Sequence, residues 1–499
     1  MGRSAAVTRS RLGWLSTPRG RALQTSVWAL LTTVLLAFAI GPEPLHLGFQ
    51  TDGDGRLAAR VRTILGADGT HRSTAGFHGL AVVTVSSSQS RWAGLGNRGD
   101  GMAPTDTTMF EIGSVTKLFT GLMLADAVDR GEVGLQESLD TYLPQLAGSP
   151  AGTVTLEELA THRSGLPAYA DDVASRGYEG VGDADVEVIT QDDVISQAAG
   201  LALMGRGTYA YSNVGFALLG YALTKSAGAP SWTSLVTERV LKPAGMKHTV
   251  FVPSIEAVPP AAAVGRLANG VTAPYSVGPS YYPAGTATFS TLDDLVSFSR
   301  WVLSGREIGS WALTPRYEIS ATDSIGLGWV VTTSPSGVAI WHNGSVPGFS
   351  SVLRIDVARR RAVAVLANSG ASVDNLSARL LEPRAPVVST GTSQPLLALA
   401  ALACVAVVWG VLMAARARRR SVALAAATAA QLGLVSAVLF LPWQNVPAWG
   451  WALASGSVFA ASILGVDRGY RHPRLLVLPV LSGAAAAGMF YALTIWLAG

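Results

Sequence analysis

Ser114 and Lys117 are the first pair of residues in this sequence whose types and spacing indicate chemistry. A separation of three residues places two side chains on one face of a helix. A serine hydroxyl becomes a good nucleophile when a neighbouring base takes its proton, and a lysine can be that base if burial or another cation lowers its pKa. The N–H groups at a helix N-terminus would also stabilise an oxyanion. A Ser-x-x-Lys match also arises by chance in a serine-rich chain, so the spacing alone leaves both interpretations open.

Further candidates follow in order along the chain. Tyr211 and Asn213 belong to the stretch Tyr211-Ser212-Asn213, which begins 97 residues after the serine, and His342-Asn343-Gly344-Ser345 lies on a predicted strand. A tyrosine is a poor base at neutral pH unless a nearby cation stabilises its phenolate. Each residue also has a structural interpretation: Tyr211 as a core tyrosine, Asn213 as a turn residue, and His342 as a hydrogen-bonded strand histidine.

The elements that must position these residues are visible in the hydrophobic pattern. An amphipathic helix is predicted over residues 115–130, because apolar residues recur at helical spacing there. Six strands are predicted from apolar runs bounded by turn residues: Leu80–Val85, Arg91–Leu95, Ile325–Val331, Val338–Trp341, Val352–Val357 and Ala362–Ala367. The segment Asp52–Gly55 is interpreted as disordered, since it lacks the later ligands of a calcium loop.

Taken together, the ordered motifs resemble the serine β-lactamase and penicillin-recognising superfamily, in particular class C β-lactamases, D-alanyl-D-alanine carboxypeptidases, D-aminopeptidases and related esterases. The resemblance covers roughly residues 60–385. It implies an α/β (α+β) β-lactamase/transpeptidase-like ectodomain, with an antiparallel sheet flanked by helices and a helical subdomain. Flanking stretches agree with it: Phe110-Glu111-Ile112-Gly113, Leu156–Pro167, Pro283-Ala284-Gly285, Gly326-Leu327-Gly328-Trp329 and Pro347-Gly348-Phe349.

The resemblance also implies roles. Ser114 would form the acyl-enzyme, and Lys117 with Tyr211 would share the acid and base work. Asn213 would hold Lys117 and the substrate amide, and the backbone N–H groups of Ser114 and Ser345 would form the oxyanion hole, brought close by a strand edge at Gly344. His342 would contact the substrate, and His162, which belongs to a family motif, is expected to be structural.

One departure from the family pattern concerns the third motif. It is usually Lys-Thr/Ser-Gly, whereas here it is His342-Asn343-Gly344. An imidazole is mostly neutral at pH 7, so it replaces a permanent ammonium poorly. This weakens the case for an efficient β-lactamase and leaves a peptidase, an amidase or an esterase open. No cofactor or metal is expected, because the seven histidines show no metal-ligand spacing and Cys404 is the only cysteine.

Composition separates the ends of the chain from its middle. Of 499 residues, 49% are hydrophobic and only 14% charged, against about a quarter charged in typical soluble domains. Residues 1–21 hold five arginines and no acid, and residues 395–499 hold seven arginines and one aspartate. The remaining 25 basic and 32 acidic residues give residues 22–394 a net charge of −7. The formal charge of +4 therefore does not indicate nucleic-acid binding.

The apolar segments at both ends predict a multi-pass protein of the cell membrane. Residues 1–42 combine an arginine-rich start with a signal anchor or signal peptide, and we favour the anchor. Residues 43–382 form the hydrolase domain and 383–394 a linker. Four membrane helices of an all-α bundle follow at 395–415, 421–441, 448–466 and 475–497. Arginine-rich loops stay in the cytoplasm, which places the catalytic domain outside.

Two functions from different classes are compatible with this pattern. The first is a membrane-anchored extracytoplasmic serine hydrolase that acts through an acyl-enzyme on small peptide, amide or ester substrates, with D-amino-acyl or cell-wall peptides favoured. The alternative is a catalytically silent, penicillin-binding-like ectodomain that serves as a binding or sensor module, with the C-terminal bundle docking a membrane-protein partner. The intact set of Ser114, Lys117 and Tyr211 favours the enzyme.

Overall fold

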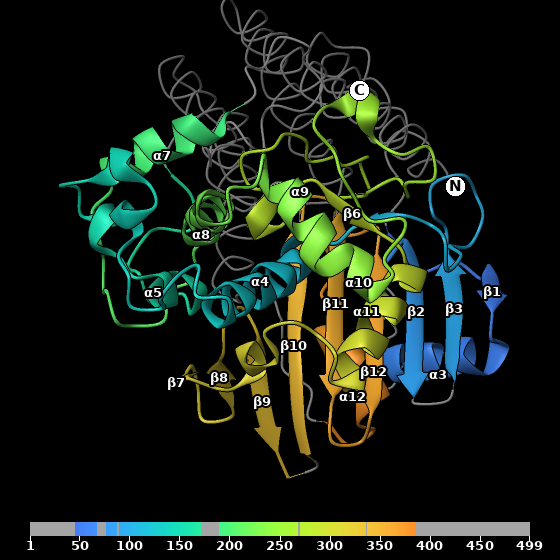
Figure 1. Ribbon diagram of the computed structural model, residues 1–499. Helices are drawn as coiled ribbons and strands as arrows, with labels where there is room; N and C mark the ends of the chain where they lie inside the picture. The colour runs from blue at the N-terminus through green and yellow to red at the C-terminus, as the bar shows by residue number, and fades with distance from the viewer. Residues whose placement is uncertain are drawn as a thin grey trace, which may run out of the picture. The chain divides into compact units, whose positions relative to one another are not determined.

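A nine-stranded antiparallel sheet organises the part of the chain that the computed structural model describes, residues 45–66, 76–86, 89–170, 189–267, 270–335 and 337–385. Its order is β1-β3-β2-β12-β11-β10-β9-β8-β7 (Figure 1). The strands are β1 (Thr51–Gly53), β2 (Gly79–Ser86), β3 (Ser90–Gly96), β7 (Tyr317–Glu318), β8 (Asp323–Ile325), β9 (Val330–Ser334), β10 (Gly337–Val346), β11 (Phe349–Asp356) and β12 (Arg361–Ala367). Because β2 pairs with β12, an early strand and the last strand along the chain lie side by side inside the sheet.

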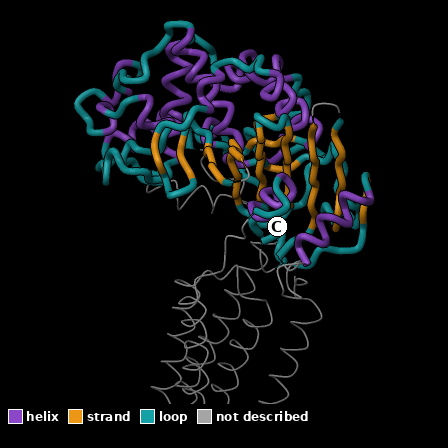
Figure 2. Tube along the Cα trace, turned by 90° about the horizontal axis from the view of Figure 1, so that it is seen from below, coloured by secondary structure: helices purple, strands orange, loops and turns teal. Residues whose placement is uncertain are grey.

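Alternation along the central strands builds two cores, one on each face of the sheet. On β12, Val363 and Val365 pack with helices α3 (Gly55–Gly66) and α12 (Asp374–Leu381), while Ala364 and Leu366 pack into the larger cluster on the opposite face. This is the period of two that a sheet buried on both faces requires. Figure 2 shows the larger group of helices gathered on one side of the strands.

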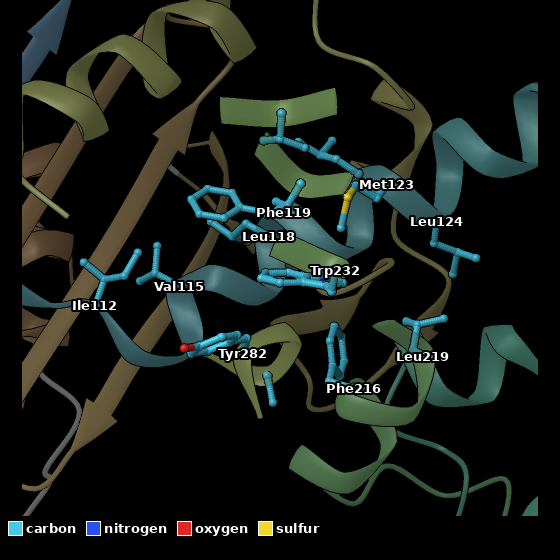
Figure 3. Packing of buried hydrophobic residues seen from close by; sticks show 14 of the residues in the cluster. Ile112, Val115, Leu118, Phe119, Met123, Leu124, Phe216, Leu219, Trp232 and Tyr282 are labelled. Carbon is cyan, nitrogen blue, oxygen red and sulfur yellow. The ribbon is translucent and has the colours of Figure 1, made fainter. Parts of the chain in front are cut away.

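The larger core joins the sheet to a helical part of the domain. Helix α8 (Asn213–Ser226) is buried over most of its length and packs against α4 (Lys117–Asp129). Figure 3 shows buried side chains from both helices in this core, among them Phe119 and Phe216. A small antiparallel sheet, β4-β6-β5, lies beside them. The other elements are β4 (Phe110–Glu111), β5 (Val250–Phe251), β6 (Thr288–Ser290), α5 (Leu156–Ala160), α7 (Gln191–Ala199), α9 (Trp232–Val236), α10 (Lys242–Ala244) and α11 (Leu292–Ser304). The short turns are η1 (Gly113–Thr116), η2 (Leu139–Thr141), η3 (Pro144–Leu146), η4 (Ala151–Thr153), η5 (Thr237–Leu241, a π turn), η6 (Ile255–Ala257), η7 (Tyr282–Ala284) and η8 (Ser310–Leu313).

The predicted antiparallel sheet flanked by helices is therefore present, but one predicted strand is wrong. The run 325–331 is divided between the end of β8 and the start of β9, and residues 326–329 leave the sheet. The N–H of Gly328 donates to the carbonyl of Ala160, and Leu327 and Trp329 are fully buried in the core. The apolar character of this run reflects burial in the core and not pairing in a sheet.

The prediction of disorder at residues 52–55 is also wrong. β1 pairs with β3, and the Asp54 carboxylate accepts hydrogen bonds of 2.9 Å from the backbone N–H groups of Arg56 and Leu57. An aspartate that accepts from the first free N–H groups of a helix is an N-cap. The segment therefore forms an edge strand and starts α3.

The predicted membrane segments, 1–42 and the four spans between 395 and 499, lie outside the described residues. Across the described ranges, no helix combines the length and the apolar character needed to cross a bilayer. The predicted membrane topology therefore stays a prediction from the sequence.

Candidate active site

The candidate nucleophile lies on the short turn η1, which leads directly into α4. Ser114 is half-buried there, and the turn begins at Gly113 with φ of +52°. A β-carbon at Gly113 would lie 3.2 Å from the backbone nitrogen of Ser345, so this glycine permits both the left-handed backbone and the close approach of β10. The predicted helix over 115–130 is thus a 3-10 turn continued by an α-helix.

Lys117 is completely buried at the start of α4 and holds three polar contacts through its Nζ. These run to Ser114 Oγ at 2.9 Å, to Asn213 Oδ1 at 2.7 Å and to the carbonyl oxygen of Ala284 at 2.6 Å. None of the three partners is a carboxylate. Burial lowers the pKa of the Lys117 ammonium well below its usual value, because desolvation disfavours the charged form.

The partners of Nζ determine which way the proton of the serine points. A neutral amine has two N–H groups and one lone pair. The amide oxygen of Asn213 and the carbonyl of Ala284 can only accept, so they take both N–H groups. In this neutral form the lone pair is left for the third contact, where the Ser114 hydroxyl can donate to it, whereas the ammonium form donates to Ser114 Oγ. Lys117 is therefore placed to take the serine proton.

Tyr211 completes the contact on the other side of the serine. Its hydroxyl donates to Ser114 Oγ over 2.7 Å, and Lys117 Nζ lies 4.8 Å from the centre of its ring. Ser114 Oγ thus accepts a hydrogen bond from the phenol, and when the amine of Lys117 is neutral the serine proton points towards it. The helical spacing predicted that Ser114 and Lys117 would meet, and the structure brings Tyr211 into direct contact with them.

The chain around Tyr211 is fixed by the start of α8. Ser212 caps this helix: its Oγ accepts from the N–H of Gly215 at 3.0 Å and donates to the carbonyl of Pro167 at 2.7 Å. The N–H of Asn213 donates to the carbonyl of Ala168 at 2.9 Å. The cap therefore aims the Asn213 amide inward at Lys117.

His162 contacts the same segment through a hydrogen bond and through its ring. The N–H of Ser212 donates to His162 Nδ1 at 3.1 Å, and the imidazole lies 4.3 Å from the Tyr211 ring, centre to centre. Burial, with a smaller effect of Lys117 and His342, lowers the pKa of the His162 imidazole well below its usual value. The residue adopts a left-handed φ of +55°, which costs energy for a non-glycine residue. The expectation of a structural histidine did not include this contact with Tyr211.

Strand β10 presents the third motif to the turn that carries the serine. β9 pairs with β10 only as far as Trp341, so residues 342–346 have no β9 partner, and η1 lies against them. A β-carbon on Gly344 would come within 2.1 Å of the Ile112 carbonyl, so only glycine fits there. The close approach puts the backbone nitrogen of Ser345 beside η1, the arrangement expected of an oxyanion hole. The Ser345 side chain itself is exposed.

His342 lies in the same region and is almost fully buried, with 3% of its surface exposed. Its Nδ1 lies 2.6 Å from the backbone oxygen of Asn343, and its ring centre is 6.1 Å from that of Tyr211. Burial, and secondarily Lys117, lowers the pKa of the His342 imidazole to about 3. The Asn343 side chain alternates to the other face of the sheet, where it donates to Asp374 at 3.1 Å.

Two functional contacts escaped sequence reasoning. The carbonyl of Ala284 orients Lys117, and a backbone oxygen leaves no residue-type signal beyond the Pro-Ala-Gly match. The Glu111 carboxyl is buried and accepts from the N–H groups of Ser276 at 3.3 Å and Ala287 at 3.0 Å. It thereby ties the strand before the serine to the segment that follows Ala284.

A serine hydroxyl held between a buried amine and a phenol, next to two backbone N–H groups, is the site of a serine hydrolase that works through an acyl-enzyme. The family comparison agrees with this class. Residues 58–382 match the family model described as Beta-lactamase, and the chain belongs to this family.

Individual relatives span a range of related proteins. The chain is 34% identical to the D-alanyl-D-alanine-carboxypeptidase/endopeptidase AmpH of Escherichia coli K12 over 184 residues, which is 36% of this chain and 46% of the relative. It is 24% identical to the putative penicillin-binding protein PbpX of Bacillus subtilis over 283 residues, 55% of this chain and 66% of the relative. The chain therefore spans about half the length of AmpH.

Solved structures show the same fold. The octameric penicillin-binding protein homologue from Pyrococcus abyssi matches with a TM-score of 0.56 and 21% identity, over 66% of this chain and 76% of that one. A class C β-lactamase from Rhodobacter sphaeroides matches with a TM-score of 0.54 and 21% identity, over 65% of this chain and 97% of that one. The superfamily and the fold expected from the motifs are confirmed.

Proposed function

We propose that this protein is a membrane-anchored, extracytoplasmic serine hydrolase that cleaves amide or ester bonds through an acyl-enzyme on Ser114, with D-amino-acyl or cell-wall peptides as substrates. The observation that carries the proposal is the double contact of Ser114 Oγ, 2.9 Å from Lys117 Nζ and 2.7 Å from the Tyr211 hydroxyl. The three hydrogen-bond partners of Lys117 Nζ described above include no carboxylate, and burial favours the neutral form of the amine.

The reaction follows from these positions. As Ser114 Oγ attacks the substrate carbonyl, its proton passes to Lys117 Nζ, and the carbonyl oxygen becomes an oxyanion beside the N–H groups of Ser114 and Ser345. When the bond to the leaving group breaks, the proton returns through Lys117 and Tyr211 to the leaving nitrogen or oxygen. A water molecule then gives its proton to the same pair and attacks the acyl-enzyme. The bond between the acyl group and Ser114 Oγ breaks, the proton passes from the pair to Ser114 Oγ, and the acid is released.

The finer parts of the proposal have separate supports. The name of AmpH, a D-alanyl-D-alanine carboxypeptidase/endopeptidase, supports D-amino-acyl substrates. The apolar segments and the distribution of arginines in the sequence support membrane anchoring and an external catalytic domain.

Active-site labelling tests the proposal. The full-length protein is treated with a fluorescent fluorophosphonate, which reacts with activated serines, and with a chromogenic D-alanine anilide. We expect labelling and turnover in the native protein and the loss of both in Ser114→Ala. Ser310→Ala, which changes an exposed serine, is the matched control and should react like the native protein. Labelling that persists in Ser114→Ala would place the reactive group elsewhere. A folded native protein that neither labels nor turns over would favour the silent binding module.

A further inference from the structure

His342 lies where it can contact a substrate bound at Ser114. Side chains alternate along β10, so His342 and Gly344 share the face that meets the serine turn, and Gly344 is packed against the Ile112 carbonyl. The His342 ring is 6.1 Å from the ring of Tyr211, which itself contacts Ser114. A group attached next to the scissile bond would therefore pass close to this imidazole.

The tautomer of His342 is fixed by its backbone contact. Nδ1 lies 2.6 Å from the carbonyl oxygen of Asn343, and a carbonyl oxygen can only accept, so Nδ1 carries the proton. A neutral imidazole has a single N–H group. Nε2, on the opposite side of the ring, is then a bare acceptor and turns away from that carbonyl.

The imidazole stays neutral at physiological pH, because its burial holds its pKa at about 3. The two other basic side chains in contact with the site's polar groups, Lys117 and His162, are also fully buried, and burial lowers the pKa of each well below its usual value. A carboxylate next to the scissile bond thus meets no positive charge on His342, the residue that replaces the ammonium of the family's third motif.

We propose that His342 determines substrate specificity by offering a hydrogen-bond acceptor. It favours substrates with an uncharged hydrogen-bond donor next to the scissile bond, such as a carboxamide or the N–H of a continuing peptide. Substrates that end there in a free carboxylate are disfavoured. The oxygens of a carboxylate carry only lone pairs, which repel the lone pair of Nε2. An amide N–H instead donates a hydrogen bond to Nε2. The inference rests on the proposed function and narrows it to internal or amidated bonds.

A matched pair of ligands tests the inference on the full-length protein. N-acetyl-D-alanyl-D-alanine and its C-terminal amide differ only in the group in question. Each is hydrolysed in parallel assays and is also used to slow the labelling of Ser114 by the fluorophosphonate. We expect kcat/KM to be at least about tenfold higher for the amide than for the free acid. Where turnover is slow, the amide should protect Ser114 from labelling better than the free acid does, by a similar factor. The free acid is disfavoured because its carboxylate would face the acceptor Nε2 of His342 with no hydrogen bond between them.

Substitution at position 342 supplies the second arm. His342→Lys should reverse the preference towards the free acid, and His342→Gln, whose amide can both donate and accept, should bring the ratio towards one. Val338→Lys puts the same charge at an exposed position of the same strand and should leave the ratio unchanged. Thermal unfolding shows which variants are folded, and if the lysine variant is not, the glutamine variant decides.

Several outcomes would overturn the specificity proposal. These are an equal or greater preference of the native protein for the free acid, no protection by either ligand, and a ratio that does not move in the folded position-342 variants. A failure of the proposed function looks different, since labelling would then be absent or would survive in Ser114→Ala.

Discussion

Replacing Glu111 by glutamine isolates the energetic effect of one buried carboxyl close to the site. Glu111 is 1% exposed, and burial raises the pKa of its carboxyl from the usual 4.5 to about 7, against the opposing effect of its hydrogen bonds from Ser276 and Ala287. Glutamine keeps the shape and one acceptor but does not titrate. The change therefore removes the proton-binding group, and the glutamine NH₂ group then faces one of the two backbone N–H donors, a cost that does not vary with pH.

The size and sign of the effect follow from linkage. The folded protein binds the Glu111 proton more tightly than the unfolded chain does, so this contribution to stability is complete below pH 4.5 and is lost as the pH rises through about 7. A pKa difference of roughly 2.5 units corresponds to about 3 kcal/mol. The stability of the native protein relative to Glu111→Gln should fall by about that amount between pH 4.5 and pH 8.

Urea unfolding of both proteins across this pH range measures the difference. His162 and His342 act in the opposite direction, because their pKa values are lowered and the stability they provide is lost as the pH falls below about 6.5. Both histidines are present in both proteins, so their effect cancels in the difference. A difference in unfolding free energy that is constant with pH, or that rises with pH, would refute the reasoning.

Two further predictions concern the proton path. Lys117→Ala should slow acylation by about 10²- to 10⁴-fold. In the native protein, the acylation rate measured by stopped flow should fall towards acid pH, because the amine of Lys117 gains a proton. A rate that is flat from acid to neutral pH would count against a neutral lysine as the base. His162→Asn should keep more activity than His162→Ala, because asparagine tolerates a positive φ and offers an oxygen to the Ser212 N–H; equal labelling rates in the two folded variants would rule out this positioning role.

Local geometry explains which parts of the site could be predicted from sequence. Ser114 and Lys117 are three residues apart on one turn, so helical spacing was enough to bring them together. No spacing argument joins Tyr211 to them across 97 residues, and that placement depended on a resemblance between ordered motifs. The residue pattern did mark Gly344, whose lack of a side chain lets β10 approach the turn.

The remaining features depend on tertiary structure. The Ala284 contact uses a backbone oxygen, whose position no side chain reveals. The burial of Glu111 and His342, which sets their charge, depends on elements distant in the chain. An apolar sequence indicates that a segment is buried, but it does not indicate whether the backbone pairs in a sheet or turns. The run Ile325–Val331 was therefore wrongly predicted as one strand.

The polar contacts of Ser114 and Lys117 come from three segments that are far apart in the sequence: the turn that carries the serine, the segment at the start of α8, and η7. A fourth segment, β10, packs against the serine turn. None of these segments can complete the arrangement alone. Covalent capture of Ser114 by a fluorescent probe should therefore count correctly folded molecules, one fluorophore for each. In a living cell, the ratio of fluorescence to total protein would then report the fraction of molecules that have folded correctly.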